Sequence, residues 1–378
     1  MAEPLVTDGG SRAPPSRTLV MGDPQASFDT VMAVLARHGA LIDGRLASDV
    51  DLITIGDHFD YGSDDPVAAG REGLRVTRWL AGHPNATLVL GNHDAARVME
   101  LIAIDDARFA TARTLASAIA ETKRTAGPDA AGVRERDEFA IQFPELAVSG
   151  LAGRDYATFC VEQRELVIEL LLAGRFRLAV VGALIDGRAA LLTHAGITRR
   201  ELTLLGMPDE RDPHVIAATL NRHLARAIDA VRPDWKRGIA TALSLEPIHV
   251  MGRAGLEGGG LLYHRPTNPD RPNAKLAELS SARPRRFDPR ALPDGLVQIA
   301  GHTGHHKCVE ELGGWVGEAA RQRERGGIRT LRVVDNIVSY DLGIAVPRVG
   351  AADLIMIDGE MRRVDPSQVD LLPLAAVM

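Results

Sequence analysis

Cysteine is scarce in this sequence, which has two among its 378 residues. Cys160 and Cys308 lie far apart and in no spacing typical of metal ligands, so a cysteine-based metal site is not expected. The two could form one disulfide, but two buried free thiols are the favoured interpretation.

Aromatic residues, excess charge and long apolar runs are also limited. Aromatics make up 4% of the chain and the net charge is −6, so neither stacking nor long-range attraction favours nucleic acid. The sequence has no run of about 18 apolar residues that could span a membrane, and its first residues lack the apolar core of a signal peptide. We therefore expect a cytoplasmic protein with neither membrane nor nucleic acid among its partners.

The remaining pattern indicates one α/β domain. Residues 1–16 are rich in proline, glycine, serine and charge, and are interpreted as a disordered leader. Residues 17–378 are predicted to form a single domain in which "RTLVMGD", "DLITIGD" and "ATLVLGNHD" are strands, with helical patterns after the first two. This alternation predicts a layered α/β sheet whose carboxyl edge carries the site.

The middle of the chain departs from this alternation. Residues 95–175 carry helical periodicity and are predicted to be a helical insertion that forms a lid over the site. After residue 175 the strand pattern returns, with a hairpin about Asp186-Gly187 and three more strand-like runs near the end. A helix is predicted over 213–232. The hairpins suggest that a second, antiparallel sheet packs on the first.

Five predicted strand ends carry polar residues: "GDPQ", "GDHFDYG", "GNHD", "THAG" and "GHTGHH". Each alone is a weak signal, because Gly-Asp usually marks a turn and a single histidine is usually structural. Together they supply oxygen and imidazole ligands, which suit divalent Mn, Fe or Zn. Two such ions about 3.5–4 Å apart would polarise a phosphoryl group and lower the pKa of a bridging water. That combination hydrolyses phosphate esters.

The order of these motifs resembles the calcineurin-like metallophosphoesterase superfamily. The pattern spans residues 22–343, and "GHT" with the later "YDLG" is most similar to the branch of bacterial phosphoprotein phosphatases and symmetrical diadenosine tetraphosphatases. The resemblance implies a four-layer α/β/β/α sandwich, with two mixed sheets flanked by helices. It also implies a metal-dependent phosphoric ester hydrolase with two divalent ions, Mn as the first choice and Fe, Zn or Mg as alternatives.

The resemblance also assigns roles to individual residues. His93 would be the general acid that protonates the leaving oxygen, oriented by Asp60, whose carboxylate raises the imidazole pKa. Asp57 would bridge both metals, because one anion between two dications relieves their repulsion. The first metal would be bound by Asp23 and Gln25, and the second by Asn92, His194 and His302.

Gln25 departs from the histidine that is usual at its position in the superfamily. An amide oxygen can ligate a divalent ion, but it is a weaker donor than imidazole. Three interpretations stand: Gln25 still binds and the first site is weakened, His305 compensates as a ligand, or the first site is lost. The survival of Asp57 and of the His93–Asp60 pair favours the first.

Tyr61 is a second departure, since the protein-phosphatase pattern has an arginine here that grips the substrate phosphate. A phenol hydroxyl donates one hydrogen bond but cannot make a bidentate charged contact. Tyr61 could contribute one hydrogen bond, but a cation elsewhere in the chain should neutralise the phosphate. Arg97 and Arg265 are the candidates. The loss argues against a standard phosphoserine or phosphothreonine phosphatase.

The predicted substrate is phosphorylated, either a phosphoprotein or a small phosphomonoester. A metal-bridging hydroxide would attack phosphorus in line while His93 protonates the leaving group. A dinucleoside polyphosphate hydrolase is the alternative, favoured if the 95–175 insertion narrows the cleft and supplies basic residues. The third hypothesis is an inactive metal-binding regulatory relative.

Overall fold

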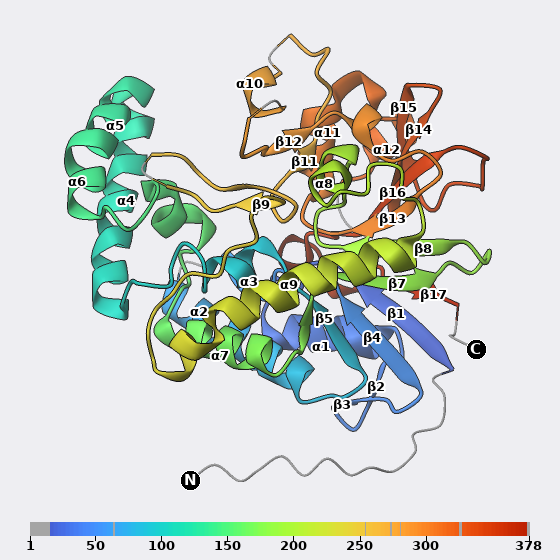
Figure 1. The fold of residues 1–378 in the computed structure, drawn as a ribbon, viewed down its shortest axis with the longest axis horizontal. Coiled ribbons are helices and arrows are strands. Elements are labelled where there is room, and N and C mark those ends of the chain that lie inside the picture. Colours follow the sequence, from blue (N-terminus) through green and yellow to red (C-terminus); the bar gives the residue numbers. More distant parts are fainter. Residues whose placement is uncertain are drawn as a thin grey trace.

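The computed structural model describes residues 16–62, 65–253, 255–272, 274–279, 281–324 and 327–375. Two β-sheets face each other at its centre and helices cover them (Figure 1). The predicted leader over residues 1–16 lies outside the described residues, apart from Ser16.

The first sheet has the strand order β17-β1-β4-β5-β6. Its central strands are parallel, and β17 pairs antiparallel with β1 at one edge. The strands are β1 (Arg17–Met21), β4 (Val50–Thr54), β5 (Ala86–Val89), β6 (Phe176–Arg177) and β17 (Leu372–Leu374). The three strands predicted from the polar strand ends are confirmed as β1, β4 and β5. Because they are parallel, their carboxyl ends meet at one edge.

The second sheet has the order β15-β14-β16-β13-β8-β7. The predicted hairpin about Asp186-Gly187 joins β7 to β8, but β8, β13 and β16 are parallel at the centre of the sheet. The expectation of an antiparallel sheet was therefore wrong there. Hairpins leave a local turn signal, whereas parallel pairs are joined by long crossovers that leave none. The strands are β7 (Ala179–Ala183), β8 (Ala189–Thr193), β13 (Val297–Ala300), β14 (Arg329–Val334), β15 (Ile337–Leu342) and β16 (Ala352–Met356).

Alternating side chains explain why the sheets stack. In β1, Leu19 and Met21 pack with the helices on the outer face, whereas Val20 belongs to the cluster between the sheets. In β16, Leu354 packs outward and Ile355 inward in the same way. Helices α1, α2 and α7 cover the first sheet, and α11 and α12 cover the second. The predicted α/β/β/α sandwich is confirmed.

Capping residues set the bounds of the flanking helices. Ser27 caps α1 (Phe28–Arg37), and Asp65 caps α2 (Pro66–Ala81), which has proline in its first turn. Helix α9 (Pro213–Lys236) contacts β7 and β8 and confirms the helix predicted over 213–232. The other helices of the sandwich are α3 (Asn92–Ala96), α8 (Arg199–Leu204), α10 (Leu276–Leu279), α11 (His305–Leu312) and α12 (Glu318–Gln322).

Short strands and tight turns complete the described chain. The two-residue strands are β2 (Leu41–Ile42), β3 (Arg45–Leu46), β9 (His249–Val250), β10 (Gly259–Gly260), β11 (Arg265–Pro266) and β12 (Arg286–Phe287). Single 3₁₀ turns occur at Pro289–Ala291, Gly313–Trp315, Met361–Arg363 and Pro366–Gln368.

The predicted insertion is helical in the structure. Helices α4, α5 and α6 form a lobe at the left of Figure 1, whereas α7 packs back on α2 and α9. The lobe has its own hydrophobic cluster, built from residues between 96 and 159. The elements are α4 (Asp106–Ala126), α5 (Pro128–Arg134), α6 (Ala140–Gln142), α7 (Val161–Leu172), and π-helical turns at Glu135–Phe139 and Leu151–Asp155. The lid role stays a prediction.

Two further expectations concern cysteine and membranes. Both cysteines are free thiols, but only Cys308 is buried, while Cys160 is half-buried. Among the described residues, no helix is both long and apolar enough to cross a membrane.

Candidate active site

The polar strand ends come together where the two sheets meet. Asp23 follows β1 and Asp57 follows β4, while Asn92 begins α3 directly after β5. From the second sheet, His194 follows β8 and His302 follows β13. Residues that are separated by up to 279 positions in the sequence are thereby in hydrogen-bonding contact.

Close backbone packing explains the glycines of the motifs. A methyl group on Gly91 would lie 2.2 Å from the backbone nitrogen of Asp57, and one on Gly56 would lie 2.6 Å from the Cα of Gly91. Only glycine therefore lets the ends of β4 and β5 approach so closely. Asp57 and His302 themselves have φ values of 54° and 62°, a strained region in which non-glycine residues concentrate at functional sites.

The buried carboxylate of Asp94 holds these two strand ends together. It accepts hydrogen bonds from the backbone nitrogens of Gly91 (2.9 Å), His58 (3.0 Å) and Asp57 (3.1 Å), and from His58 Nδ1 (2.9 Å). Burial would raise the pKa of Asp94, but the charge of His58 and these hydrogen bonds lower it below its ordinary value.

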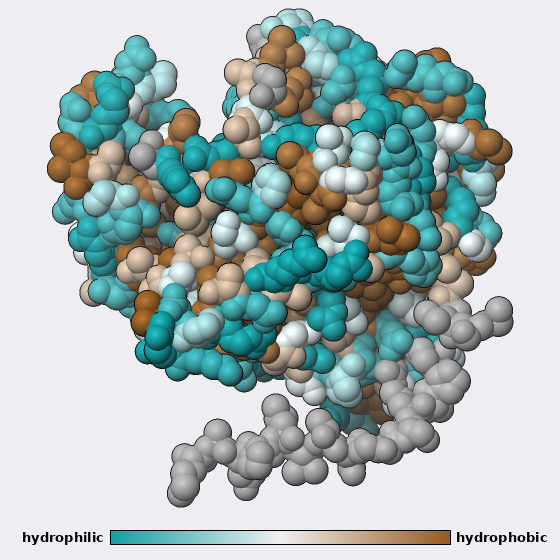
Figure 2. Space-filling model, in the orientation of Figure 1, coloured by the Kyte–Doolittle hydropathy of each residue, from teal (hydrophilic) through white to brown (hydrophobic). Residues whose placement is uncertain are grey.

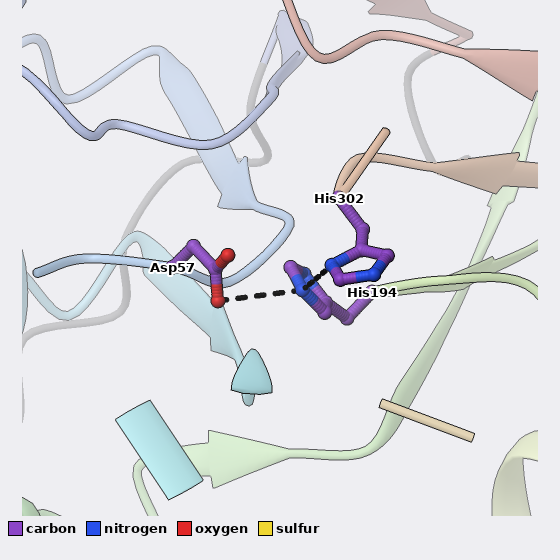
Figure 3. Close-up of side chains that lie close together, drawn as sticks. All are labelled: Asp57, His194 and His302. Atoms are coloured by element: carbon purple, nitrogen blue, oxygen red, sulfur yellow. Dashed lines mark hydrogen bonds and ion pairs between the residues drawn. The ribbon is translucent and has the colours of Figure 1, made fainter. Parts of the chain in front are cut away.

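Four side chains converge on a single point beside Asp57. Asp57, His194 and His302 are buried and offer ligand atoms within 4.8 Å of one another (Figure 3). His194 Nε2 lies 3.3 Å from Asp57 Oδ1, 3.1 Å from His302 Nδ1 and 3.0 Å from Asn92 Oδ1. The ligand set predicted for the second metal is thus brought together.

Backbone carbonyls determine which nitrogen each imidazole presents. His194 Nδ1 donates to Ile55 O at 2.6 Å, and His302 Nε2 donates to Tyr263 O at 3.1 Å. The opposite nitrogens therefore carry lone pairs that face each other. Burial, the charge of Arg265 and the neighbouring His194 lower the pKa of His302 well below its ordinary value. Two imidazole nitrogens and a carboxylate in this arrangement fit a divalent metal ion.

Asp23 and Gln25, the residues predicted for the first metal, lie in the same cavity. The backbone nitrogen of His302 donates to both Asp23 carboxylate oxygens, at 3.0 and 2.9 Å, and so links the two proposed sites. Gln25 Nε2 donates to Phe59 O at 3.1 Å. Because its nitrogen is used in this way, the amide oxygen is the atom that Gln25 offers to a metal.

A further carboxylate, Asp358, lines the cavity and was missed in the sequence. It follows β16, and its Oδ1 accepts from the backbone nitrogen of Glu360 at 2.8 Å. Burial, then the charges of Asp358 and Asp57, raise the pKa of Asp23 well above its ordinary value, as expected for carboxylates grouped closely together. The signal was a strand ending in a carboxylate, but Asp358-Gly359 is equally typical of a turn.

His93 lies between Asp60 and the cluster. Its Nδ1 is 3.0 Å from Asp60 Oδ2, and its Nε2 is 3.7 Å from Asp57 Oδ2. Burial alone would lower the pKa of His93, but the charge of Asp57 and the hydrogen bond and charge of Asp60 raise it above its ordinary value. A protonated imidazole with its free nitrogen toward the cluster is suited to proton donation.

The structure corrects the prediction that Arg97 contacts the substrate phosphate. Its side chain is fully buried, with Nη1 2.5 Å from Asp60 Oδ2 and 2.7 Å from His93 O. Nε and Nη2 donate to Gln163 Oε1 at 3.2 and 2.9 Å. Because its guanidinium contacts Asp60, His93 and Gln163 inside the protein, Arg97 orients Asp60 and does not reach the substrate.

The insertion also contacts this pair. Thr158 Oγ1 and the Thr158 backbone nitrogen lie 2.5 and 3.2 Å from Asp60 Oδ1. The ring of Tyr156 meets that of His93 edge-on, with centroids 5.2 Å apart. Neither residue belongs to a motif, so these contacts could not be predicted from the sequence.

A cavity of about 660 Å³ opens over these residues, and Arg265 lines it. Arg154 and Asp155, from the end of the insertion, also line it, and the surface in Figure 2 is indented beside the lobe of α4, α5 and α6. Among the described residues, neither Tyr61 nor His305 belongs to the lining.

His305 is therefore corrected as a metal ligand. It is the first residue of α11, and its ring stacks on that of Tyr340 with centroids 5.9 Å apart and an interplanar angle of 10°. Its Nδ1 lies 3.4 Å from the Tyr340 hydroxyl. The start of the helix turns the side chain into the outer core, away from the cavity.

Comparison with known protein families decides the classification. The chain matches the family described as calcineurin-like phosphoesterase over residues 16–216, more than half of its length. The chain belongs to the calcineurin-like phosphoesterases. No curated protein matches it. The match does not include His302, Arg265 and Asp358. Their assignment to the site rests on the geometry described above.

Calcineurin-like phosphoesterases typically bind divalent metals, and the Asp57, His194 and His302 cluster of this member is a suitable site. Gln25 and Tyr61, the two residues that depart from the family pattern, are placed differently in this calcineurin-like phosphoesterase. Gln25 lines the cavity with its amide oxygen free, whereas Tyr61 does not line it.

Proposed function

We propose that this protein is a phosphatase that uses two divalent metal ions, Mn by preference, to hydrolyse phosphomonoesters with His93 as the general acid. The observation that carries this proposal is the place of His93, which is hydrogen-bonded to Asp60 through Nδ1 and has Nε2 3.7 Å from Asp57. A proton held there can be delivered to an oxygen that leaves from a phosphoryl group at the cluster.

The metal ligands follow from the two groups of donors. Asp57, Asn92, His194 and His302 would hold one ion, and Asp23, Gln25 and the shared Asp57 the other. When bound, the ions would polarise the phosphoryl group and activate the attacking water. The protein's own contribution is to turn one nitrogen of each imidazole ligand toward the site, through the carbonyls of Ile55 and Tyr263, and to hold the carboxylates in place.

Asp60 and its partners set the protonation state of the general acid. The charge on Arg97 and hydrogen bonds from His93 and Thr158 keep Asp60 ionised, and Asp60 in turn favours the imidazolium form of His93. After proton donation, His93 would be neutral and would recover its proton from solvent through the open cavity.

Arg265 would contact the substrate phosphate. It lines the cavity, and its guanidinium carbon lies 5.5 Å from the centre of the Tyr263 ring. The backbone oxygen of the same Tyr263 accepts the hydrogen bond from His302 Nε2. The favoured substrates are phosphoproteins or small phosphomonoesters, within the branch of bacterial phosphoprotein phosphatases and diadenosine tetraphosphatases.

A dinucleoside polyphosphate hydrolase is the second candidate, and one observation favours it. Arg154 from the insertion lines the cavity, as expected if the insertion supplies basic residues to a longer polyphosphate. However, Arg154 is already paired with Asp155 at 2.7 Å and lies 3.5 Å from Glu257. The phosphomonoester therefore remains the first candidate.

The proposal is tested with metal-stripped protein reloaded with Mn. We expect two ions per chain and hydrolysis of p-nitrophenyl phosphate, and phosphopeptides should be cleaved faster than diadenosine tetraphosphate. Faster symmetric cleavage of the dinucleotide would favour the second candidate. Fewer than two ions per chain with no turnover on any substrate would leave a metal-binding regulatory protein instead.

A further inference from the structure

Many basic side chains line the cavity, but most of them are already paired with carboxylates of the protein. Eight arginine and lysine side chains line it. Six of them are paired with a carboxylate oxygen within 4.0 Å: Arg154, Lys275, Arg285, Arg286, Lys307 and Arg363. Within the described part of the chain, Arg265 and Arg362 are the two that have no such partner. Any phosphate bound here would find its cationic contacts in these two residues.

Arg362 lies beside the motif that has lost its arginine. It belongs to the 3₁₀ turn Met361–Arg363 that follows β16, and its side chain is exposed to the cavity. A methyl group placed on Gly62 would lie 3.5 Å from Arg362 Nη1, so the guanidinium is next to the residue that follows Tyr61. The charge of Arg362 is also within electrostatic reach of Asp60 and Asp358.

We propose that Arg362 is a phosphate-binding residue of this site, which supplies from the end of the chain the guanidinium that position 61 lacks. The inference rests on the proposed phosphatase function. Arg265 would contact the phosphate from the side of His302, and Arg362 from the side of Asp60 and Gly62. Two guanidinium groups can each make bidentate hydrogen bonds to a phosphate dianion, which a tyrosine hydroxyl cannot.

The neighbouring residue provides a matched control. Arg363 carries the same charge one position further along the same turn, but it is paired with Glu360 at 3.4 Å and also lines a second, separate cavity. Loss of the charge at Arg363 therefore tests whether any positive charge on this turn attracts phosphate at long range. Loss of the charge at Arg362 tests a direct contact with the phosphate.

The experiment measures binding of inorganic phosphate to the Mn-loaded protein by calorimetry, together with kcat and KM for p-nitrophenyl phosphate. Arg362→Gln should weaken phosphate binding and raise KM by about tenfold or more, the scale of charge-assisted hydrogen bonds. Arg362→Lys should recover part of the affinity, and Arg363→Gln should stay within about twofold of wild type. Metal content and thermal stability should not change in any of the three.

Unchanged phosphate affinity in Arg362→Gln would overturn the inference, as would an equal loss in Arg363→Gln. Both results leave the proposed function intact, provided that the wild type turns over. If Mn-loaded wild type neither binds phosphate nor hydrolyses any phosphoester, the proposed function fails and the inference fails with it.

Discussion

Thr158 Oγ1 lies 2.5 Å from Asp60 Oδ1, although the two residues are 98 positions apart. Thr158 stands near the end of the helical insertion, and Asp60 belongs to the loop after β4 that carries Asp57. The insertion is therefore more than a peripheral lobe, because it supplies one of the groups that fix the partner of His93.

Replacement of Thr158 by valine removes this hydrogen bond and keeps the shape of the side chain. We expect kcat for a phosphomonoester to fall by about tenfold, because a hydrogen bond to a charged group is worth ~1.5–3 kcal/mol. KM should change little. Steady-state kinetics test this, with Thr114→Val as a control, since the Thr114 hydroxyl donates to Ala110 O on an exposed face of α4, away from Asp60. Equal kcat values for the two variants would exclude the role.

Arg97 should contribute to the stability of the fold and not to phosphate binding. Arg97→Met leaves Asp60 buried without its cation, and we expect the free energy of unfolding to fall by about 3–5 kcal/mol. The affinity of the folded protein for inorganic phosphate should stay near that of wild type, because Arg97 does not line the cavity. Urea unfolding and calorimetry measure the two quantities. A loss of phosphate affinity with full stability would restore Arg97 as a substrate contact.

For the site, the sequence and the structure agree on the motif residues at strand ends and differ at several residues outside those motifs. Asp23, Asp57, Asn92, His194 and His302 could be placed because each follows a predicted strand and the order of the motifs is specific. The positions of Arg97 and His305 depend instead on the direction in which a helix begins, which periodicity does not reveal. Asp358 and Arg362 lie in the segment that follows β16, where no local pattern connects them to the other motifs.

Asp358 should strengthen the first metal site. Its carboxylate lies with Asp23 in the cavity, and a divalent ion would relieve the repulsion among the grouped carboxylates. We expect Asp358→Asn to lower the Mn content of the protein from two ions per chain toward one at limiting Mn. Metal analysis after dialysis measures this, and Asp335→Asn, at an exposed residue paired with Arg348, is the control. Full occupancy in Asp358→Asn would show that Asp358 is not needed for metal binding.

Asp94 gives a stability prediction that depends on pH. The folded-state pKa of Asp94 is lowered, so its ionised form stabilises the protein above the unfolded-state pKa of about 3.9. This contribution is lost as the pH falls through the folded-state pKa. Asp94→Asn should therefore reduce the free energy of unfolding by about 3–5 kcal/mol at pH 7, and the difference should shrink below about pH 4.

Urea unfolding of both proteins at pH 7 and at pH 3 to 4 measures that difference, and Asp129→Asn on the exposed face of α5 is the control. A difference that is constant with pH would mean that Asp94 acts through its shape or its neutral hydrogen bonds.

The most direct test of the account compares His93→Ala with wild type on two substrates that differ in leaving group. An alkyl phosphate needs a proton on its departing oxygen, whereas p-nitrophenolate leaves readily without one. If His93 is the general acid, the substitution should lower kcat for the alkyl phosphate by about two orders of magnitude or more, and for p-nitrophenyl phosphate by much less. Equal losses on both substrates, with two metal ions still bound, would contradict proton donation by His93.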